Sequence, residues 1–139
     1  MDKPPPFQPV IRSQSDVEGL WRRLMNPLGF SSCSLWLVVI EDDLPLPQIT
    51  EFSEMPDAPD PELAQKLGEI LERLVEPDTS FAFLRTRPGG GTPTPDDLGW
   101  ARVLHDAGRR IGAPLQVTHL AHDHDVVPLV LDDLLAEPA

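Results

Sequence analysis

The chain has 139 residues, a typical length for one domain, and 40% of them are hydrophobic, which is enough for one core. Its formal net charge at pH 7 is −12, whereas proteins that bind duplex nucleic acid normally carry a basic stripe. The longest apolar run, LWLVVI (35–40), is too short to span a bilayer. We therefore expect no nucleic-acid partner and no membrane association.

Charge is distributed unevenly along the chain. Residues 41–79 hold twelve Asp and Glu against Lys66 and Arg73, whereas residues 85–110 hold five arginines against three Asp. We interpret the acidic stretch as a surface that favours solubility.

Cys33 is the single cysteine, which excludes an internal disulfide and a cysteine-based zinc site. We expect it to be buried and unreactive, because it precedes a buried strand and has no basic neighbour in sequence. The start, MDKPPPFQPV, has no apolar core of the signal-peptide kind, and its prolines favour an extended arm over residues 1–12. We expect a cytoplasmic protein in which residues 13–135 form a single domain.

Three elements are predicted in the first part of the chain. Residues 13–27 favour a helix, because Ser15 and Glu18 have capping-box spacing and apolar residues recur on one face. SLWLVVI (34–40) is continuous, branched and aromatic, as in a buried strand. PQITEFS (47–53) predicts a weaker strand nearer an edge of the sheet.

Five further elements follow. Asp60 is suited to cap a helix over 61–75, with Pro61 at its first position. The remaining pattern predicts a buried strand over 80–84, a helix over 95–111, and strands over 115–121 and 126–131.

Strands thus alternate with helices, which favours an α/β fold with a mixed central sheet flanked by helices. The buried strands 34–40, 80–84 and 115–121 are expected in the middle of that sheet, with the helices near 61–75 and 95–111 packed on it.

Residues 84–98, LRTRPGGGTPTPDDL, combine a strand end, a glycine loop and a helix start. Arg85 and Arg87 alternate and therefore share one face of the strand. Thr94 suits the N-cap of the following helix, and Asp97 lies in its first turn.

These residues allow two interpretations. An arginine can reach Asp96 or Asp97 across the loop, and we expect a partly exposed pair with Asp97 that contributes no more than about 1 kcal/mol. Alternatively, the stretch binds an anion, because arginine forks and the free N–H groups of a glycine loop recognise carboxylate or phosphate. The residues of that alternative site are Arg85, Arg87, Gly89, Gly90 and Gly91.

The stretch resembles the metal-binding segment of the JAB/MPN metalloprotease-like family, in particular its bacterial RadC-like branch. In that branch a strand ends in His-x-His-Pro, and a proline-containing loop with Ser-x-x-Asp leads into a helix. The two His and the Asp bind zinc. Here Arg85 and Arg87 stand at the histidine positions and Pro88 matches the following proline. With one residue deleted, Thr94 falls on the Ser and Asp97 on the Asp.

The resemblance extends over residues 13–121. His119 matches the histidine of the family's Asp-His strand, and Thr118 replaces the Asp. The family's general-base Glu is expected just before the first long strand, where Cys33 or Ser34 stands. The resemblance implies a three-layer JAB/MPN-like (cytidine-deaminase-like) fold with a degenerate site.

The chemistry of the ligand set supports that implication. A hydrolytic zinc needs three protein ligands with lone pairs and one open position for water. Arginine offers no lone pair and stays protonated, so Arg85 and Arg87 would repel a dication. We expect no metal at this site, no cofactor and no metalloprotease activity.

A second polar cluster lies in HLAHDHD (119–125), which gathers three of the four histidines beside two Asp. Metal binding through His122 and His124 is conceivable there. The position between two predicted strands equally suits an ordinary polar turn, which is the interpretation we favour.

The sequence therefore predicts a non-catalytic RadC-like JAB domain that binds or scaffolds an unidentified protein partner, with a homodimer as one possibility. One alternative is an enzyme or sensor that binds an anionic small molecule or acidic peptide at Arg85 and Arg87. Another is a metal-binding protein that uses the His119–His124 turn.

Overall fold

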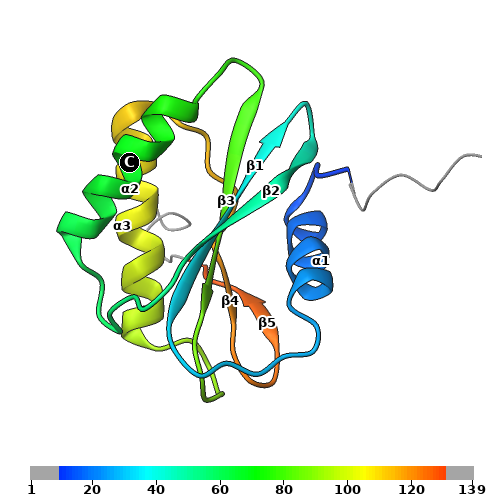
Figure 1. Cartoon of the computed structure of the whole chain (residues 1–139), viewed down its shortest axis with the longest axis vertical. Coiled ribbons are helices and arrows are strands. Elements are labelled where there is room, and N and C mark those ends of the chain that lie inside the picture. The colour runs from blue at the N-terminus through cyan, green and yellow to red at the C-terminus, as the bar shows by residue number, and fades with distance from the viewer. Residues whose placement is uncertain (1–9, 131–139) are drawn as a thin grey trace, which may run out of the picture.

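The computed structural model describes residues 10–130 of the chain (Figure 1). Three helices and five strands follow one another in the predicted order of types. The elements are α1 (Gln14–Leu24), β1 (Ser34–Glu41), β2 (Leu44–Phe52), α2 (Pro61–Leu74), β3 (Thr79–Thr86), α3 (Pro95–Ile111), β4 (His119–Ala121) and β5 (Val126–Pro128).

The five strands form one mixed sheet in the order β2-β1-β3-β4-β5. β1 pairs antiparallel with β2 and β3, β3 pairs parallel with β4, and β4 pairs antiparallel with β5. The predicted buried strands therefore do occupy the middle of the sheet, and β2 lies at an edge as expected.

Helices cover both faces of the sheet, as Figure 1 shows, with α1 on one face and α2 and α3 on the other. Trp21 of α1 packs with Val38 and Leu84 of the central strands. Trp100 of α3 and Leu71 of α2 pack with Phe83 on the opposite side of the same strands. The predicted α/β class with a mixed, helix-flanked sheet is confirmed.

Several predicted boundaries are wrong. Ser13, not Ser15, caps α1, because its side chain accepts a hydrogen bond from the Asp16 N–H at 3.2 Å. β4 begins at His119, and Leu115 makes only an isolated bridge to Phe81. Both late strands are shorter than predicted, because 115–118 and 129–130 have no regular strand pairing.

The ends of the predicted domain fall partly outside the described residues. Residues 1–9 of the predicted arm and residues 131–135 of the predicted domain are not described. Ile11 is buried in the core beneath α1, and its N–H donates to the Asp43 carbonyl. Within residues 10–130, no helix combines the length and the apolar character needed to cross a membrane.

The start of α3 is fixed by a capping box. The Thr94 hydroxyl accepts from the Asp97 N–H at 3.2 Å, and the Asp97 carboxylate accepts from the Thr94 N–H at 2.8 Å. Pro95 occupies the first helical position, where a missing N–H costs no intrahelical bond. This cap holds the Asp97 side chain against the end of β3.

Candidate functional site

The end of β3 and the start of α3 bring Arg85, Arg87 and Asp97 together. Asp97 Oδ1 accepts from Arg85 Nε at 2.7 Å and from Arg87 Nε at 2.9 Å. Asp97 Oδ2 accepts from Arg87 Nη2 at 2.9 Å, which makes the Arg87 contact a two-point fork. The sequence-based interpretation that these arginines pair with Asp97 fits this geometry.

The pair is buried, and the expectation of a partly exposed pair is wrong. The residues Arg85, Arg87 and Asp97 are 2%, 9% and 0% exposed. Sequence spacing alone gave no sign of this burial, which depends on a loop 28 residues upstream. The Asp57 carbonyl in that loop accepts from Arg85 Nη2 at 3.1 Å and from Trp100 Nε1 at 3.1 Å.

Two arginines share one carboxylate, so the cluster carries an excess positive charge. Arg87 Nη1 donates to the Pro88 carbonyl at 3.2 Å. Arg85 Nη1 is the one guanidinium nitrogen of the described cluster that is fully buried without a partner. A small anion approaching this cluster would find five of the six guanidinium nitrogens already engaged.

The pKa of the Asp97 carboxyl reflects competing effects. Burial raises it, but hydrogen bonds from Arg87, the Thr94 N–H and Arg85 outweigh burial and lower the pKa to about 2 from an ordinary value of 3.8. The charged carboxylate is therefore the stable form at neutral pH, as the two buried arginines require.

The glycine loop is tied to the histidine turn through Asp123. Asp123 Oδ2 accepts from the Gly89 N–H at 2.8 Å, and Asp123 Oδ1 accepts from the Phe30 N–H at 2.9 Å. A Cβ on Gly90 would lie 2.5 Å from the ring of the exposed His124, so a larger residue there would require that side chain to move. Gly91 has φ of 86°, which also favours glycine.

This arrangement bears on the candidate anion site. The N–H of Gly89 already donates to the Asp123 carboxylate, and a negative side chain stands beside the loop. Both arginines direct Nε to the Asp97 carboxylate, while Arg87 Nη1 lies beside the loop, 3.7 Å from where a Cβ on Gly89 would stand. An anion bound here would therefore compete with the Asp97 and Asp123 carboxylates for these donors.

The three histidines of the predicted turn have different surroundings. His119 lies in β4, fully buried, with Nδ1 3.1 Å from the Val117 carbonyl. His122 is buried and its Nδ1 accepts from the His124 N–H at 3.1 Å, whereas His124 is exposed. Over residues 10–130, no three His, Cys, Asp or Glu side chains come together in a group that could hold a metal ion.

Cys33 is buried, as predicted, and has a partner that the sequence did not suggest. Its Sγ donates to Asp57 Oδ1 at 2.9 Å. Burial and this carboxylate raise the pKa of the thiol to about 11. Asp57 therefore links Cys33, Arg85 and Trp100, yet its place in a proline-rich loop offered no signal of that role.

A comparison with models of known protein families finds no match, and a comparison with curated proteins finds none either. The resemblance to the RadC-like family therefore rests on the residues of the chain itself.

The first prediction concerns the buried carboxylate. Asp97→Ala leaves two buried arginines without a counter-charge, so we expect the free energy of unfolding to fall by about 3–5 kcal/mol in urea melts. Asp96→Ala is the matched control, since it removes a first-turn acid of α3 that joins no described ion pair, and should cost less than about 1 kcal/mol. Equal losses in the two variants would contradict the assigned role of Asp97.

The second prediction concerns pH. The folded pKa of Asp97 lies below its unfolded value, so its stabilisation is complete above about pH 4 and is lost as the pH falls toward 2. This lowering of the pKa corresponds to about 2 kcal/mol of folding stability. Urea melts between pH 5 and 2 should show a steeper loss for the wild type than for Asp97→Asn. Parallel curves would show that Asp97 does not titrate in this way.

The third prediction concerns Cys33. Because its raised pKa leaves little thiolate, the native thiol should react with a disulfide reagent at pH 8 more than tenfold slower than the urea-unfolded chain. Asp57→Ala removes the carboxylate that favours the protonated thiol and should speed the native reaction. A native rate equal to the unfolded rate would contradict the assignment.

Proposed function

We propose that the chain is a RadC-like JAB domain that has lost its metal ligands and acts as a non-catalytic module for binding or scaffolding a protein partner. The observation that carries this proposal is the contact of Arg85 and Arg87 with Asp97. These residues stand at the three zinc-ligand positions of the resembled family, and they bind one another.

The contact supports a structural role for the former site. A catalytic zinc needs lone-pair ligands and an open position for water or substrate. Here the arginines supply positive charge at the same place and the carboxylate is fully buried. The position expected for the general base holds Cys33 or Ser34 in place of the Glu, and the raised pKa of Cys33 keeps its thiol protonated.

The alternative of an anion-binding enzyme or sensor has one observation in its favour, the unpartnered Arg85 Nη1. A ligand anion there would have to displace or share the Asp97 carboxylate. Phosphate should therefore raise the urea midpoint no more than chloride at equal ionic strength, whereas a specific rise would favour the alternative.

The fourth prediction tests both the resemblance and the loss of metal. Wild type incubated with zinc and dialysed should retain well under one zinc per chain by elemental analysis. The double variant Arg85→His with Arg87→His restores the family's ligand set around Asp97 and should retain close to one zinc. Adding Asp97→Ala to that variant should abolish retention.

Two results would contradict the proposal. Near-stoichiometric zinc in the wild type would show a metal site in this chain, and its loss on replacing His122 and His124 by Ala would place that site in the histidine turn. A folded double-histidine variant that retains no zinc would remove the support for a JAB-like ligand geometry.

A further inference from the structure

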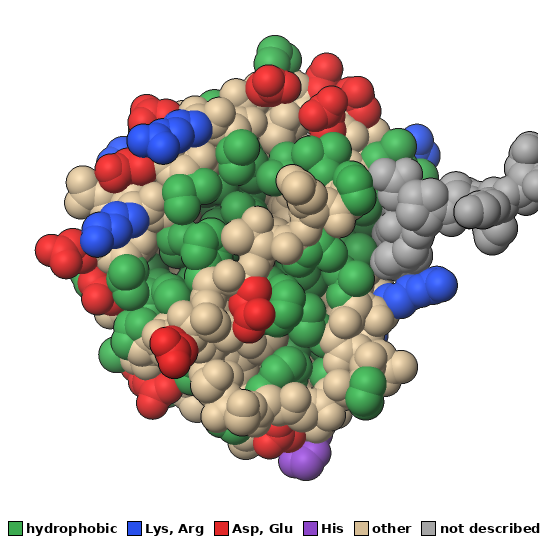
Figure 2. Space-filling view, in the orientation of Figure 1, with side chains coloured by type: hydrophobic (Ala, Val, Ile, Leu, Met, Phe, Trp, Pro, Cys, Tyr) green, Lys and Arg blue, Asp and Glu red, His purple; other side chains and the backbone are tan. Residues whose placement is uncertain are grey.

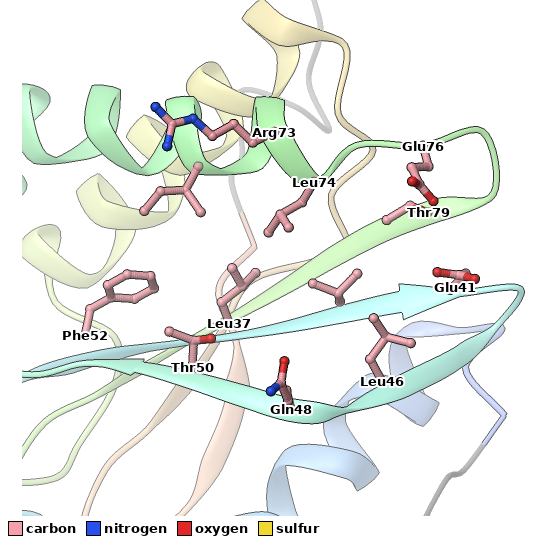
Figure 3. Close-up of a pocket in the computed structure, with 12 residues that line it drawn as sticks. Leu37, Glu41, Leu46, Gln48, Thr50, Phe52, Arg73, Leu74, Glu76 and Thr79 are labelled. Carbon is pink, nitrogen blue, oxygen red and sulfur yellow. The ribbon is translucent and has the colours of Figure 1, made fainter.

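A groove of about 420 Å³ opens beside α2 on the sheet face that also carries α3. Leu37, Leu46 and Phe52 of β1 and β2 line one side, and Leu74 of α2 lies on the other (Figure 3). Ile70 of α2 also lines the groove. Figure 2 shows hydrophobic side chains gathered between these elements on the exposed surface. Leu46, Ile70 and Leu74 are 38%, 37% and 41% exposed, so the apolar walls are open to solvent.

One end of the groove is acidic. Glu41 and Glu76 lie there with Thr79, as Figure 3 shows. The adjoining turns add Asp42, Asp43 and Asp78, and the Asp42 N–H donates to the Asp78 carbonyl, which holds the two turns together. Among residues 10–130, Arg73 is the only basic residue that lines the groove. A partner is therefore favoured if it presents positive charge at this end.

The arrangement of the layer favours a helix in the groove. α2 packs on α3 through Gly68, whose added Cβ would lie 3.4 Å from the Ala107 Cβ. Ile70 and Leu74 do not join that contact but line the groove together with residues of β1 and β2, so a third helix beside α2 would continue the layer at the usual spacing of about 8–10 Å. Strand addition at the β2 edge is disfavoured, because Pro45 and Pro47 have no N–H to donate.

A second copy of the chain fits poorly by charge. A self-complementary contact places the same surface on both partners, and this surface carries more acid than base on a chain of net charge −12. Like charges brought together across an interface oppose association.

We propose that this groove binds an amphipathic helix of a partner protein, with the helix's apolar face in the groove and its lysines or arginines at the Glu41–Glu76 end. This inference rests on the proposed function, since a non-catalytic module acts through a binding surface. Anchors at helical positions i, i+3 or i+4 and i+7 fit such a groove.

The test uses the full chain and a synthetic 18-residue helical peptide with leucines on one face and lysines on the other. We expect saturable binding by fluorescence anisotropy, with NMR amide shifts concentrated in β1, β2 and the second half of α2. Leu46→Gln should raise the dissociation constant of the peptide about tenfold. Leu44→Gln is the matched control, on the same strand and equally exposed at 38% but outside the groove, and should change it less than twofold.

The charge contribution has its own matched pair. Glu41→Lys with Glu76→Lys should weaken peptide binding at least fivefold at low salt, and the loss should shrink as salt is added. Glu69→Lys with Glu72→Lys makes the same change in net charge on the α3 side of α2 and should weaken binding less than twofold. A peptide with glutamates in place of its lysines should bind at least tenfold more weakly.

Any of the following results would overturn the inference: no binding of the lysine peptide, shifts centred elsewhere, or equal effects of Leu46→Gln and Leu44→Gln. A dimer in light scattering that Leu46→Gln disrupts and Leu44→Gln does not would assign the groove to a second copy. None of these results bears on the proposed loss of metal, which is tested separately by measuring zinc retention. Zinc retained by the wild type would overturn the proposed function and would leave the binding results unaffected.

Discussion

The Asp97 carboxylate accepts hydrogen bonds from two arginines and from the first turn of α3, and the adjoining parts of the chain depend on this contact. It fixes the end of β3 to the start of α3. Through Arg85 the same cluster holds the Asp57 carbonyl, and Asp57 in turn holds Trp100 and Cys33. A buried charge is tolerated only when it is paired, so these contacts must form together.

A cluster of two cations and one anion is an unusual use of a buried position. Replacing buried ion pairs by apolar side chains is often neutral or stabilising, so the cluster is weak evidence for a gain in stability. The cluster does constrain geometry, since the two-point contact of Arg87 with the Asp97 carboxylate fixes both the distance between the two side chains and their relative orientation. We interpret the cluster as a device that sets how α3 sits on the sheet, in the place where a metal would do so in the family that the chain resembles.

The elements could be predicted from sequence where local signals were strong. Continuous apolar runs identified β1 and β3, and the Asp60-Pro61 and Thr94-Pro95 pairs marked helix starts that the structure retains. The late strands were predicted too long, because Leu129 is buried against Ala101 of α3 and makes a backbone hydrogen bond to Thr118 although neither Leu129 nor Thr118 belongs to a strand. The contact of Arg85 and Arg87 with Asp97 was foreseeable from spacing. Its burial was not, because it depends on Asp57 far upstream, and neither was the role of Asp123.

The two sides of α2 explain why the closed cluster and the open groove coexist. One side contacts α3 through a glycine, which allows α3 to lie close and to stay over β3, where Arg85 and Arg87 end. α2 and α3 lie toward the middle of the sheet and their cluster reaches β2 at Phe52, whereas Leu46 farther along that edge stays exposed. The packing that encloses the Arg85–Arg87–Asp97 cluster thus leaves apolar surface exposed at the β2 edge of the sheet, and exposed apolar patches of this kind favour recognition of a partner.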